Sequence, residues 1–490
     1  MIKYRENPTH LINWKLISSI DITMDGCKLS TNNIDTNSWH KTEVPSTILG
    51  SLVKNGVYKD PYLGTNLKKI PTEQFKTPWW YRTEFEISEN QIKKIVLLAL
   101  DGINYRANIW LNGKLVADEN VVYGAYRRFQ FNISPHLQIG KNVLAIELIP
   151  PKPGDFSIGF VDWNPNPPDN NFGIFRDVYL KFTNGVSIEY PFVESKIKNR
   201  FDVAELTVSA EIVNHTDHTF RGTLKGSIEN IEFEFVVELL PNENKSVKLS
   251  SDEFKQLVIE NPKLWWPNNL GNPNLYELKL DLIAEDEILD NSISKFGIRQ
   301  IEDYINAGGH RGYQINGHEI LIKGAGWTDD LLLQDTHDSL RAQIEYVKHM
   351  NLNCIRLEGF WGKDQKIYDL CDEYGILIMV GWSCHWEHEQ YLGKPIDLRY
   401  GGVIELDEID LVAKSWEDQL LWLRHHPSIF VWTVGSDMVP HPDLERRYVE
   451  IFSKYDSSRP YLNSTGGVGS EQGIITTTEI ISEISGSSRV

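Results

Sequence analysis

Acidic side chains follow each of four short apolar segments after about residue 301. Asp329 and Asp330 come after the first segment, and Glu358 comes after the second. A stretch that contains Glu387 follows the third, and Asp437 follows the fourth. If the segments are parallel strands, their carboxyl ends meet at one edge of a sheet, where the active sites of α/β barrels lie. A carboxylate after the fourth strand fits glycoside hydrolysis, which uses two carboxyl groups across the scissile bond.

Tryptophans stand beside three of these carboxylate positions. They are Trp327, Trp361 and Trp382. Across the chain there are 15 Trp, 20 Tyr and 19 Phe, and aromatic residues make up 11%. Flat rings with one polar edge can stack on the C–H faces of sugars. The same rings are typical of the cores of aromatic-rich β-sandwiches, so both interpretations stay open.

Each carboxylate also has a purely structural interpretation. Asp437 could cap the N-terminus of a helix after the fourth strand, as aspartate does well. Glu358 could form a buried ion pair with Arg356, which lies two residues earlier. Asp329 and Asp330 could cap the first helix, and for Asp329 we favour that role over contact with a substrate.

The stretch 384–389 contains side-chain types that bind metals. Its His and Glu residues lack the HExxH spacing, and the sequence shows no second group of ligands. His425 and His426 precede a predicted strand at the end of a helix, where histidine interacts favourably with the helix dipole. We therefore expect no metal site, and the chemistry considered requires no cofactor.

The first 300 residues have the alternating pattern of antiparallel β-sandwiches. Up to about residue 190, period-2 runs are separated by turn residues, and Asn112-Gly113 is a strong hairpin signal. Between about 191 and 300 the runs continue on a shorter scale, at 206–213, 231–237 and 276–282. A domain of about 100 residues with about seven such strands indicates an immunoglobulin-like sandwich. We predict one sandwich over 1–190 and a second over 191–300.

After about residue 301, apolar runs alternate with helical spacing, which indicates parallel βα units. Strands are expected at 320–325, 354–357, 376–380, 429–434 and 459–463. Helices are expected at 339–350, 365–374 and 407–425. A closed barrel of eight units needs about 250 residues, so only about four or five units fit before residue 463. We predict a partial (β/α)8 TIM barrel over 301–463, followed by an irregular tail over 464–490.

The charge balance disfavours some classes of partner. With 49 basic and 68 acidic side chains, the net charge of −19 repels nucleic acids and anionic membrane surfaces. The sequence contains no apolar run of about 18 residues, so no transmembrane helix is predicted. The four cysteines form no CxxC pair. Charged residues interrupt 1–21, so no signal peptide is expected. As written the chain would be cytoplasmic, and extracellular or periplasmic if an upstream signal was lost.

Several motifs, in order along nearly all of residues 13–463, resemble those of glycoside hydrolase family 2. That family includes β-galactosidases, β-glucuronidases and β-mannosidases. The motifs include Val44-Pro-Ser-Thr, Pro78-Trp-Trp-Tyr, Gly173-Ile-Phe-Arg-Asp-Val, Leu264-Trp-Trp-Pro, His426-Pro-Ser-Ile and Gly435-Ser-Asp. The resemblance implies a sugar-binding jelly roll, an immunoglobulin-like domain and a TIM-barrel catalytic domain. It also implies an O-glycosyl hydrolase that acts on β-linkages with retention.

Within this family the chain looks most like exo-β-D-glucosaminidases, which release glucosamine from the non-reducing end of chitosan. Most of the family has Asn-Glu where this chain has Ser436-Asp437. By resemblance Asp437 is the general acid/base. Ser436 and Glu358 would accept hydrogen bonds from the protonated 2-amino group, because that group offers only donors. The implied partner is an oligosaccharide with a β-linked amino sugar or mannose.

The resemblance implies further substrate contacts in the barrel and in the first sandwich. They are Trp327, Trp361, Trp382, Asp330, Asp169 and Asn170. The three tryptophans would form pocket walls. Asp169 and Asn170 would reach the sugar from a loop of the first domain, and the alternative is a simple Pro-Asp-Asn turn.

The family's nucleophile, a glutamate after the seventh strand, has no counterpart that we identify in this sequence. Glu471, Glu479 and Glu483 have the wrong surroundings for that role. A retaining displacement needs two carboxyl groups about 5–5.5 Å apart. We therefore interpret the chain as C-terminally truncated and expect it to have little or no hydrolase activity alone. A β-mannosidase or endo-β-mannosidase specificity, or a carbohydrate-binding pseudoenzyme, are the alternatives.

Overall fold

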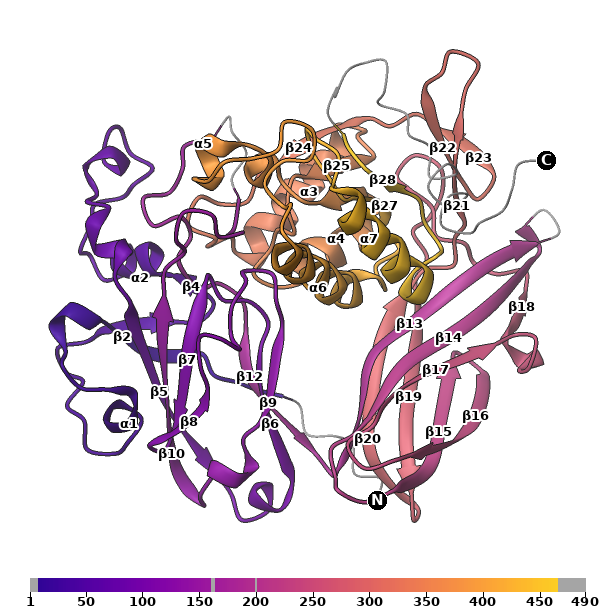
Figure 1. The fold of residues 1–490 in the computed structure, drawn as a ribbon. Coiled ribbons are helices and arrows are strands. Elements are labelled where there is room, and N and C mark those ends of the chain that lie inside the picture. Colours follow the sequence, from indigo (N-terminus) through magenta and orange to yellow (C-terminus); the bar gives the residue numbers. More distant parts are fainter. Residues whose placement is uncertain (1–7, 160–163, 199–200, 466–490) are drawn as a thin grey trace.

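The chain is organised as two β-sandwiches that support half of a parallel α/β barrel (Figure 1). The computed structural model describes residues 8–159, 164–198 and 201–465. In Figure 1 the first sandwich, in indigo and purple, and the second, in magenta and pink, stand side by side beneath the orange and yellow half barrel. The predicted fold classes of all three parts are confirmed.

The first sandwich packs a four-stranded sheet against a six-stranded one. The smaller sheet has the order β1 (Thr9–His10), β12 (Val178–Thr183), β6 (Ile95–Leu100) and β9 (Phe129–Asn132). The larger sheet has the order β3 (His40–Glu43), β2 (Asn13–Ser18), β5 (Trp79–Ile87), β10 (Gly140–Ile149), β7 (Arg106–Leu111) and β8 (Lys114–Ala117). The remaining α-helices and strands described in this domain are α1 (Gly26–Leu29), α2 (Ile48–Lys54), β4 (Ser46–Thr47) and β11 (Gly173–Ile174).

The hairpin predicted at Asn112-Gly113 joins β7 to β8. Asn112 and Gly113 have φ of +49° and +81°, as a two-residue type I′ turn requires at both central positions. Alternating residues of the flanking strands, such as Ile109 and Leu111, are fully buried between the two sheets. The Asn-Gly pair therefore predicted the turn, and the period-2 pattern predicted the face that forms the core.

The second sandwich is immunoglobulin-like and begins with a long strand. One sheet contains β13 (Val186–Lys198), β14 (Val203–Asn214) and β17 (Asn244–Ser250), with β18 (Val258–Glu260) paired to β14. The other has the order β16 (Ile231–Leu239), β15 (Phe220–Ile228), β19 (Tyr276–Ala284) and β20 (Glu287–Phe296). The runs predicted at 206–213, 231–237 and 276–282 lie inside β14, β16 and β19. Because β13 starts at Val186, it extends across the predicted boundary at 190.

A small antiparallel sheet, which was not predicted, precedes the barrel. It consists of β21 (Ile301–Ile305), β22 (Arg311–Ile315) and β23 (His318–Ile320). Asn316 and Gly317, both with positive φ, turn the chain between β22 and β23. The strand expected at 320–325 is therefore wrong in position, because β23 ends this hairpin and the first parallel strand starts at Gly324.

Five parallel strands form the half barrel. Their order is β24 (Gly324–Trp327), β25 (Cys354–Leu357), β26 (Leu377–Gly381), β27 (Ile429–Thr433) and β28 (Tyr461–Leu462). The helices are α3 (His337–His349), α4 (Lys366–Tyr374), α5 (Glu389–Leu392), α6 (Leu406–Leu423) and α7 (Pro442–Tyr455). Four of the five predicted strands and all three predicted helices are present within about two residues of their expected bounds.

Helix α7 was not predicted, although its sequence carries the expected signals. His441 caps the helix, and Pro442 occupies the first turn, where a missing N–H costs nothing. Leu444, Tyr448 and Phe452 recur every four residues and are buried, as the inner face of an amphipathic helix requires. The period of the sequence was thus sufficient to place this helix.

The first sandwich is fixed to the barrel through a buried arginine. Arg176 lies fully inside the protein and donates hydrogen bonds to the Phe360 carbonyl and the Gln419 side chain, both at 2.7 Å. Gln419 in turn donates to the Tyr126 carbonyl at 2.6 Å. Because a buried guanidinium needs such acceptors, this network holds loops of the first domain against the barrel.

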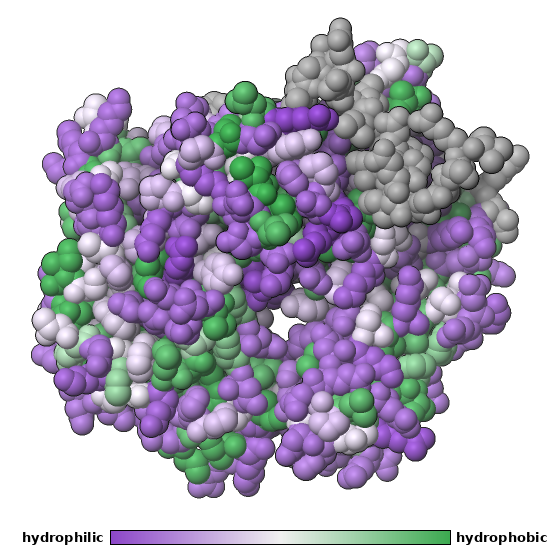
Figure 2. Space-filling view, in the orientation of Figure 1, coloured by the Kyte–Doolittle hydropathy of each residue, from purple (hydrophilic) through white to green (hydrophobic). Residues whose placement is uncertain are grey.

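Hydrophilic side chains cover most of the face shown in Figure 2, with smaller hydrophobic groups between them. A small opening is visible near the centre of this view, below the half barrel and between the two sandwiches. None of the helices that the structure describes is long and apolar enough to cross a membrane.

Candidate active site

Asp437 lies at the carboxyl ends of the parallel strands, just after β27. Its side chain is 47% exposed, and its Oδ2 atom lies 3.0 Å from Nε2 of His388. His388 comes from the segment after β26, the neighbouring strand. The predicted general acid/base is therefore an accessible carboxyl group with a hydrogen-bonding partner from the next strand. The alternative role as a helix cap does not hold, because His441 caps the following helix.

Glu387 holds the backbone of this loop, a role that was not predicted for it from its place after the third strand. The carboxylate is buried and accepts hydrogen bonds from three successive backbone N–H groups, those of Ser436 at 2.8 Å, Asp437 at 2.6 Å and Met438 at 3.1 Å. Burial raises the pKa of Glu387 to about 7, although the three N–H groups oppose this shift. Because three consecutive amides share one acceptor, the peptide that carries Asp437 is fixed in place.

A glycine before Asp437 is required by the same tight loop. A Cβ atom on Gly435 would lie 2.4 Å from the Met438 carbonyl oxygen and 2.5 Å from that of Asn463. Such distances are too short for any side chain, so the loop closes only with glycine at this position. The Gly435-Ser436-Asp437 motif therefore has a steric reason as well as a chemical one.

Arg356 connects the two residues predicted to recognise an amino group. Its Nη1 lies 3.3 Å from Oε1 of Glu358, and its Nη2 donates to Ser436 Oγ at 3.2 Å and to Thr465 Oγ1 at 2.6 Å. The structural alternative for Glu358, an ion pair with Arg356, is therefore what the structure shows. The arginine also brings Glu358 and Ser436 into one polar group beside Asp437.

Two of the predicted pocket walls are core residues. Trp382 is buried among the rings of Phe360, Trp386 and Trp416, with centroids at 4.7–5.3 Å, and donates from Nε1 to Tyr448 at 2.8 Å. Trp361 is buried as well. The prediction of an open sugar platform at these positions is wrong, because close-packed aromatic rings gain more by burying their large surfaces together.

Trp327 is the predicted wall that stays partly exposed. It lies at the end of β24 and packs against the same aromatic core. Its Nε1 atom is buried and has no acceptor within the described part of the chain. A buried N–H without a partner is unfavourable, so this group could donate to a polar ligand.

Asp330 and Asp329 shape the loop after β24 instead of capping α3. The cap of α3 is Thr336, so the prediction of a capping role is wrong for both. Asp330 Oδ1 accepts from the backbone N–H groups of Leu332 and Gln334, both at 3.1 Å. Asp329 accepts from the Gly362 N–H at 2.8 Å, and burial raises its pKa to about 7. Aspartate favours such local turns as strongly as helix caps.

Asp169 and Asn170 form the turn that was the alternative to sugar contact. Asp169 is buried and accepts from the N–H of Leu49 at 2.9 Å and of Asn171 at 3.1 Å. Burial raises the pKa of Asp169 to about 6. Asn170 has a φ of +50° and is exposed. The carboxylate of Asp169 thus ties the loop to the start of α2, and the prediction that it reaches the sugar is wrong.

Two groups of side chains have metal-ligand types close together. Ligand atoms of Glu387, His388 and Asp437 lie within 4.8 Å of one another, as do those of Asp369, Asp372 and His426. In the first group both oxygens of Glu387 already accept backbone N–H groups. The expectation of no metal site stays a prediction, since these arrangements also make sense as hydrogen-bonded networks.

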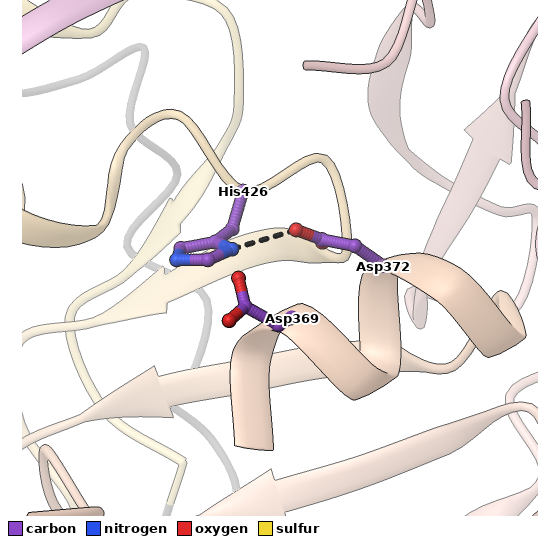
Figure 3. A group of neighbouring side chains, drawn as sticks. All are labelled: Asp369, Asp372 and His426. Atoms are coloured by element: carbon purple, nitrogen blue, oxygen red, sulfur yellow. Dashed lines mark hydrogen bonds and ion pairs between the residues drawn. The ribbon is translucent and has the colours of Figure 1, made fainter. Parts of the chain in front are cut away.

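The second group lies at the opposite, amino ends of the strands (Figure 3). Asp369 and Asp372 extend from α4 toward His426, and Asp372 Oδ2 lies 2.6 Å from Nδ1 of the histidine. The other oxygen of Asp372 accepts from the Ser428 N–H at 2.9 Å. Arg299, at the end of the second sandwich, donates to the neighbouring Pro427 carbonyl at 2.7 Å. Arg299 therefore joins the second sandwich to the base of the barrel, directly beside this group.

The three glutamates considered for the nucleophile, Glu471, Glu479 and Glu483, lie outside the described residues, as does the predicted tail from residue 466 onward. The carboxyl-end site in the described part of the chain thus contains one exposed carboxyl group, one carboxylate paired with arginine, one buried carboxylate and one histidine. Their residues are Asp437, Glu358, Glu387 and His388.

Three models of one family match the chain in succession. The galactose-binding domain-like model of glycosyl hydrolase 2 matches residues 28–153, and the model named glycosyl hydrolases family 2 matches 186–299. The TIM barrel domain model of the same family matches 310–482.

Curated relatives resemble the chain over most of its length. The exo-β-D-glucosaminidase of Amycolatopsis orientalis is 31% identical over 93% of this chain and 43% of the relative. The exo-β-D-glucosaminidase of Hypocrea jecorina is 31% identical over 93% of this chain and 52% of the relative. The mannosylglycoprotein endo-β-mannosidase of Lilium longiflorum is 29% identical over 88% and 48%. The chain thus spans about half the length of the curated relatives it matches.

Solved structures show the same correspondence. The exo-chitosanase CsxA of Amycolatopsis orientalis matches with a TM-score of 0.86 at 29% identity, over 94% of this chain and 53% of that chain. A complex of a CsxA variant with PNP-β-D-glucosamine matches with a TM-score of 0.87 at 30% identity over the same shares. The β-D-mannosidase of Dictyoglomus thermophilum shares the fold, with a TM-score of 0.74 at 23% identity over 94% and 58%.

Proposed function

The chain belongs to glycoside hydrolase family 2, and from this premise we propose that it carries the proton-donating and amine-recognising part of an exo-β-D-glucosaminidase site. The observation that carries the proposal is the placement of Asp437. Its carboxyl group is exposed, and Glu387 fixes the backbone that carries it through three hydrogen bonds. The similarity to exo-β-D-glucosaminidases over 93% of the chain supports the choice of sugar.

Asp437 acts as the general acid/base in this proposal. In its protonated form it gives its proton to the glycosidic oxygen as the bond to the anomeric carbon breaks. As a carboxylate it later takes a proton from the attacking water. His388 keeps the carboxyl group oriented through the contact at 3.0 Å. Glu387 limits movement of the backbone, so the proton is held where the leaving oxygen must lie.

Glu358 recognises the 2-ammonium group of glucosamine. An ionised carboxylate has about four lone-pair sites, and the contact with Arg356 uses Oε1. Capacity therefore remains for one N–H donor of the sugar. Ser436 Oγ already accepts from Arg356 at 3.2 Å, so we assign the amine mainly to Glu358. The net charge of −19 also favours a cationic sugar over an anionic one.

Binding without hydrolysis is the behaviour that we expect of the 490 residues alone. Retention needs a second carboxyl group about 5–5.5 Å from the first, and among the described residues our assignment supplies only Asp437 for the chemical step. Glu387 is excluded from the nucleophile role, because both of its oxygens accept backbone hydrogen bonds. The chain would then bind the sugar as a pseudoenzyme does.

Calorimetric titration of the chain with three disaccharides tests the proposal. Chitobiose should bind, while β-1,4-mannobiose and N,N′-diacetylchitobiose should bind at least about tenfold more weakly, since they lack the ammonium group. Glu358→Gln should lower the affinity for chitobiose about tenfold and leave mannobiose unchanged. Incubation with chitobiose should release no glucosamine. Equal affinity for all three sugars contradicts the recognition of the amine by Glu358. Release of glucosamine that Asp437→Ala abolishes contradicts binding without hydrolysis, and release that persists in Asp437→Ala contradicts the role of Asp437.

A β-mannosidase specificity is the second candidate, and one observation favours it. Arg356 lies 3.3 Å from Glu358 and balances its charge, so the carboxylate would gain less from a sugar cation. A neutral 2-hydroxyl group would then suit the site as well. The similarity to the endo-β-mannosidase of Lilium longiflorum fits this reading. Tighter binding of mannobiose than of chitobiose in the same titration would select it.

A further inference from the structure

A cleft lies between the first sandwich and the barrel, beside the loop after β24. It has a volume of about 530 Å³, within the range of about 300–1,000 Å³ that ligand sites occupy. Residues from the α2 region form one wall, and residues 330–339 form the other. The lining residues that matter for its chemistry are Tyr58, Asp60, Tyr62, Asp330, Gln334 and Asp335.

Three carboxyl groups line the cleft, and no lysine or arginine is among its lining residues. Asp60 comes from the first sandwich, and Asp330 and Asp335 come from the barrel. Burial and the neighbouring charge of Asp330 both raise the pKa of Asp335, although Lys363 nearby lowers it. The negative charges are therefore incompletely balanced, and a cation that enters the cleft would relieve their repulsion.

Tyr62 offers an aromatic surface in the same cleft. Its side chain is 56% exposed, yet its hydroxyl group donates to Asp330 Oδ1 at 2.8 Å across the domain boundary. This hydrogen bond fixes the ring without covering it. A fixed, exposed ring can stack on the C–H face of a pyranose at little cost in conformational entropy. The cleft thus combines a sugar-stacking surface with carboxylates.

The backbone that carries these groups is also held in place. Asp60 Oδ1 accepts from the Tyr62 N–H at 2.9 Å, and Asp335 Oδ2 accepts from the Asp330 N–H at 3.1 Å. Gln334 donates to Ser46 Oγ at 3.3 Å and so links the two walls. The cleft is therefore preformed, which lowers the entropic penalty of binding.

We propose that this cleft binds amino-sugar units of a chitosan-type chain, in addition to the sugar held near Asp437. The choice of ligand rests on the proposed function, while the cleft itself rests on geometry and charge. Asp330 follows β24, at the same edge of the parallel sheet as Asp437. Each glucosamine unit carries one ammonium group, so a chain presents a row of cations to a row of carboxylates. Long cationic chains would bind more tightly than single sugars for this reason.

The test compares glucosamine with its hexamer, chitohexaose, by calorimetric titration at about pH 6 into the full chain. The double variant Asp60→Asn/Asp335→Asn should bind chitohexaose about tenfold more weakly, at about threefold per charge pair, and glucosamine as the wild type does. The asparagine side chains keep an oxygen for the two backbone N–H groups, so the loops should persist. Tyr62→Ala should also weaken chitohexaose about tenfold and spare glucosamine.

Two controls separate the cleft from general charge effects. Asp217→Asn removes one negative charge from an exposed site in the second sandwich and should leave both affinities unchanged. N-acetylated chitohexaose lacks the cations, so wild type and double variant should bind it equally. If the double variant binds chitohexaose as tightly as the wild type, or if Asp217→Asn weakens it equally, the cleft proposal is overturned.

The same titrations keep this proposal distinct from the proposed function. If glucosamine fails to bind but chitohexaose binding requires Asp60 and Asp335, the proposed cleft site is supported and the proposed sugar site near Asp437 is contradicted. If glucosamine binds and chitohexaose gains nothing over it, the assignment near Asp437 stands and the cleft falls.

Discussion

Two aspartate–histidine pairs occupy opposite ends of the barrel strands. At the carboxyl ends, Asp437 and His388 are 3.0 Å apart, with side chains 47% and 34% exposed. At the amino ends, Asp372 and His426 are 2.6 Å apart, with side chains 6% and 1% exposed. The chemical groups are the same, and the surroundings differ.

The difference shows that the two pairs are distinguished by burial and not by residue type. Burial raises the pKa of Asp372 to about 7 and lowers that of His426 to about 4, so both side chains favour their neutral forms near pH 6. Such a pair works as a hydrogen-bonded connector beneath the barrel (Figure 3). The exposed pair remains accessible to water, as the proposed role of Asp437 requires.

The largest expected effect comes from removing the buried acid. Asp372→Ala leaves the Ser428 N–H buried without its acceptor and His426 Nδ1 buried without its hydrogen-bonding partner, and should lower the free energy of unfolding by about 3–5 kcal/mol. Asp437→Ala, at the exposed site, should change it by only about 0.5 kcal/mol. Calorimetric melting of both variants gives the comparison. Similar losses for the two would mean that burial does not distinguish the pairs.

A smaller effect on stability is expected from Glu387, the buried acid at the carboxyl ends of the strands. Its pKa of about 7 exceeds the ordinary 4.5 of glutamate because of burial, so the folded chain binds this proton more tightly than the unfolded chain. The stability from this group is fully present below about pH 4.5 and is lost as pH rises through about 7.

Glu387→Gln removes this titration. Between pH 5 and pH 8 the free energy of unfolding of the variant should therefore fall less than that of the wild type, by on the order of 3 kcal/mol. Chemical unfolding of wild type and variant at the two pH values measures the difference. Glu389, which is exposed and lies two residues away, supplies the matched control, and Glu389→Gln should leave the wild-type slope intact. An unchanged slope for Glu387→Gln would place its carboxylate in contact with water.

The smallest effect is expected from His388→Gln. An exposed pair of this kind contributes about 0.2–1 kcal/mol, and screening should reduce even that amount in about 1 M salt. Unfolding at low and high salt therefore should show a difference between His388→Gln and wild type only at low salt. A loss of several kcal/mol, insensitive to salt, would show that the carboxyl-end pair is as structural as the Asp372 pair.

Local sequence pattern predicted the parts of the fold that depend on neighbouring residues. Continuous apolar runs placed β25 and β27, and helical spacing with a terminal glycine placed α4, whose cap Gly375 has a φ of +73°. Turn chemistry placed the hairpin at Asn112-Gly113. These signals work because hydrogen bonding and side-chain direction repeat within a few residues.

Contacts between distant segments were the part that pattern could not predict. Glu387 and Ser436 are separated by nearly fifty residues, and their hydrogen bond depends on β26 and β27 being neighbours. Trp382 follows a strand end, as a pocket wall would, but four aromatic rings pack around it, and three of them, those of Tyr126, Phe360 and Trp416, come from other segments. A one-dimensional pattern contains no information on which side of a loop will be covered.

The sequence by itself determined the order of the three domains and the parallel strands of the barrel. It also determined that Asp437 lies at the carboxyl ends of these strands, because each of these features follows from local periodicity. Only the tertiary structure decided which carboxyl groups remain exposed to water. It buried Glu387 and Asp372, paired Glu358 with Arg356 and left Asp437 exposed. Access to water and the choice of partner depend on segments that meet only after folding, and these two factors give identical carboxyl groups different chemistry.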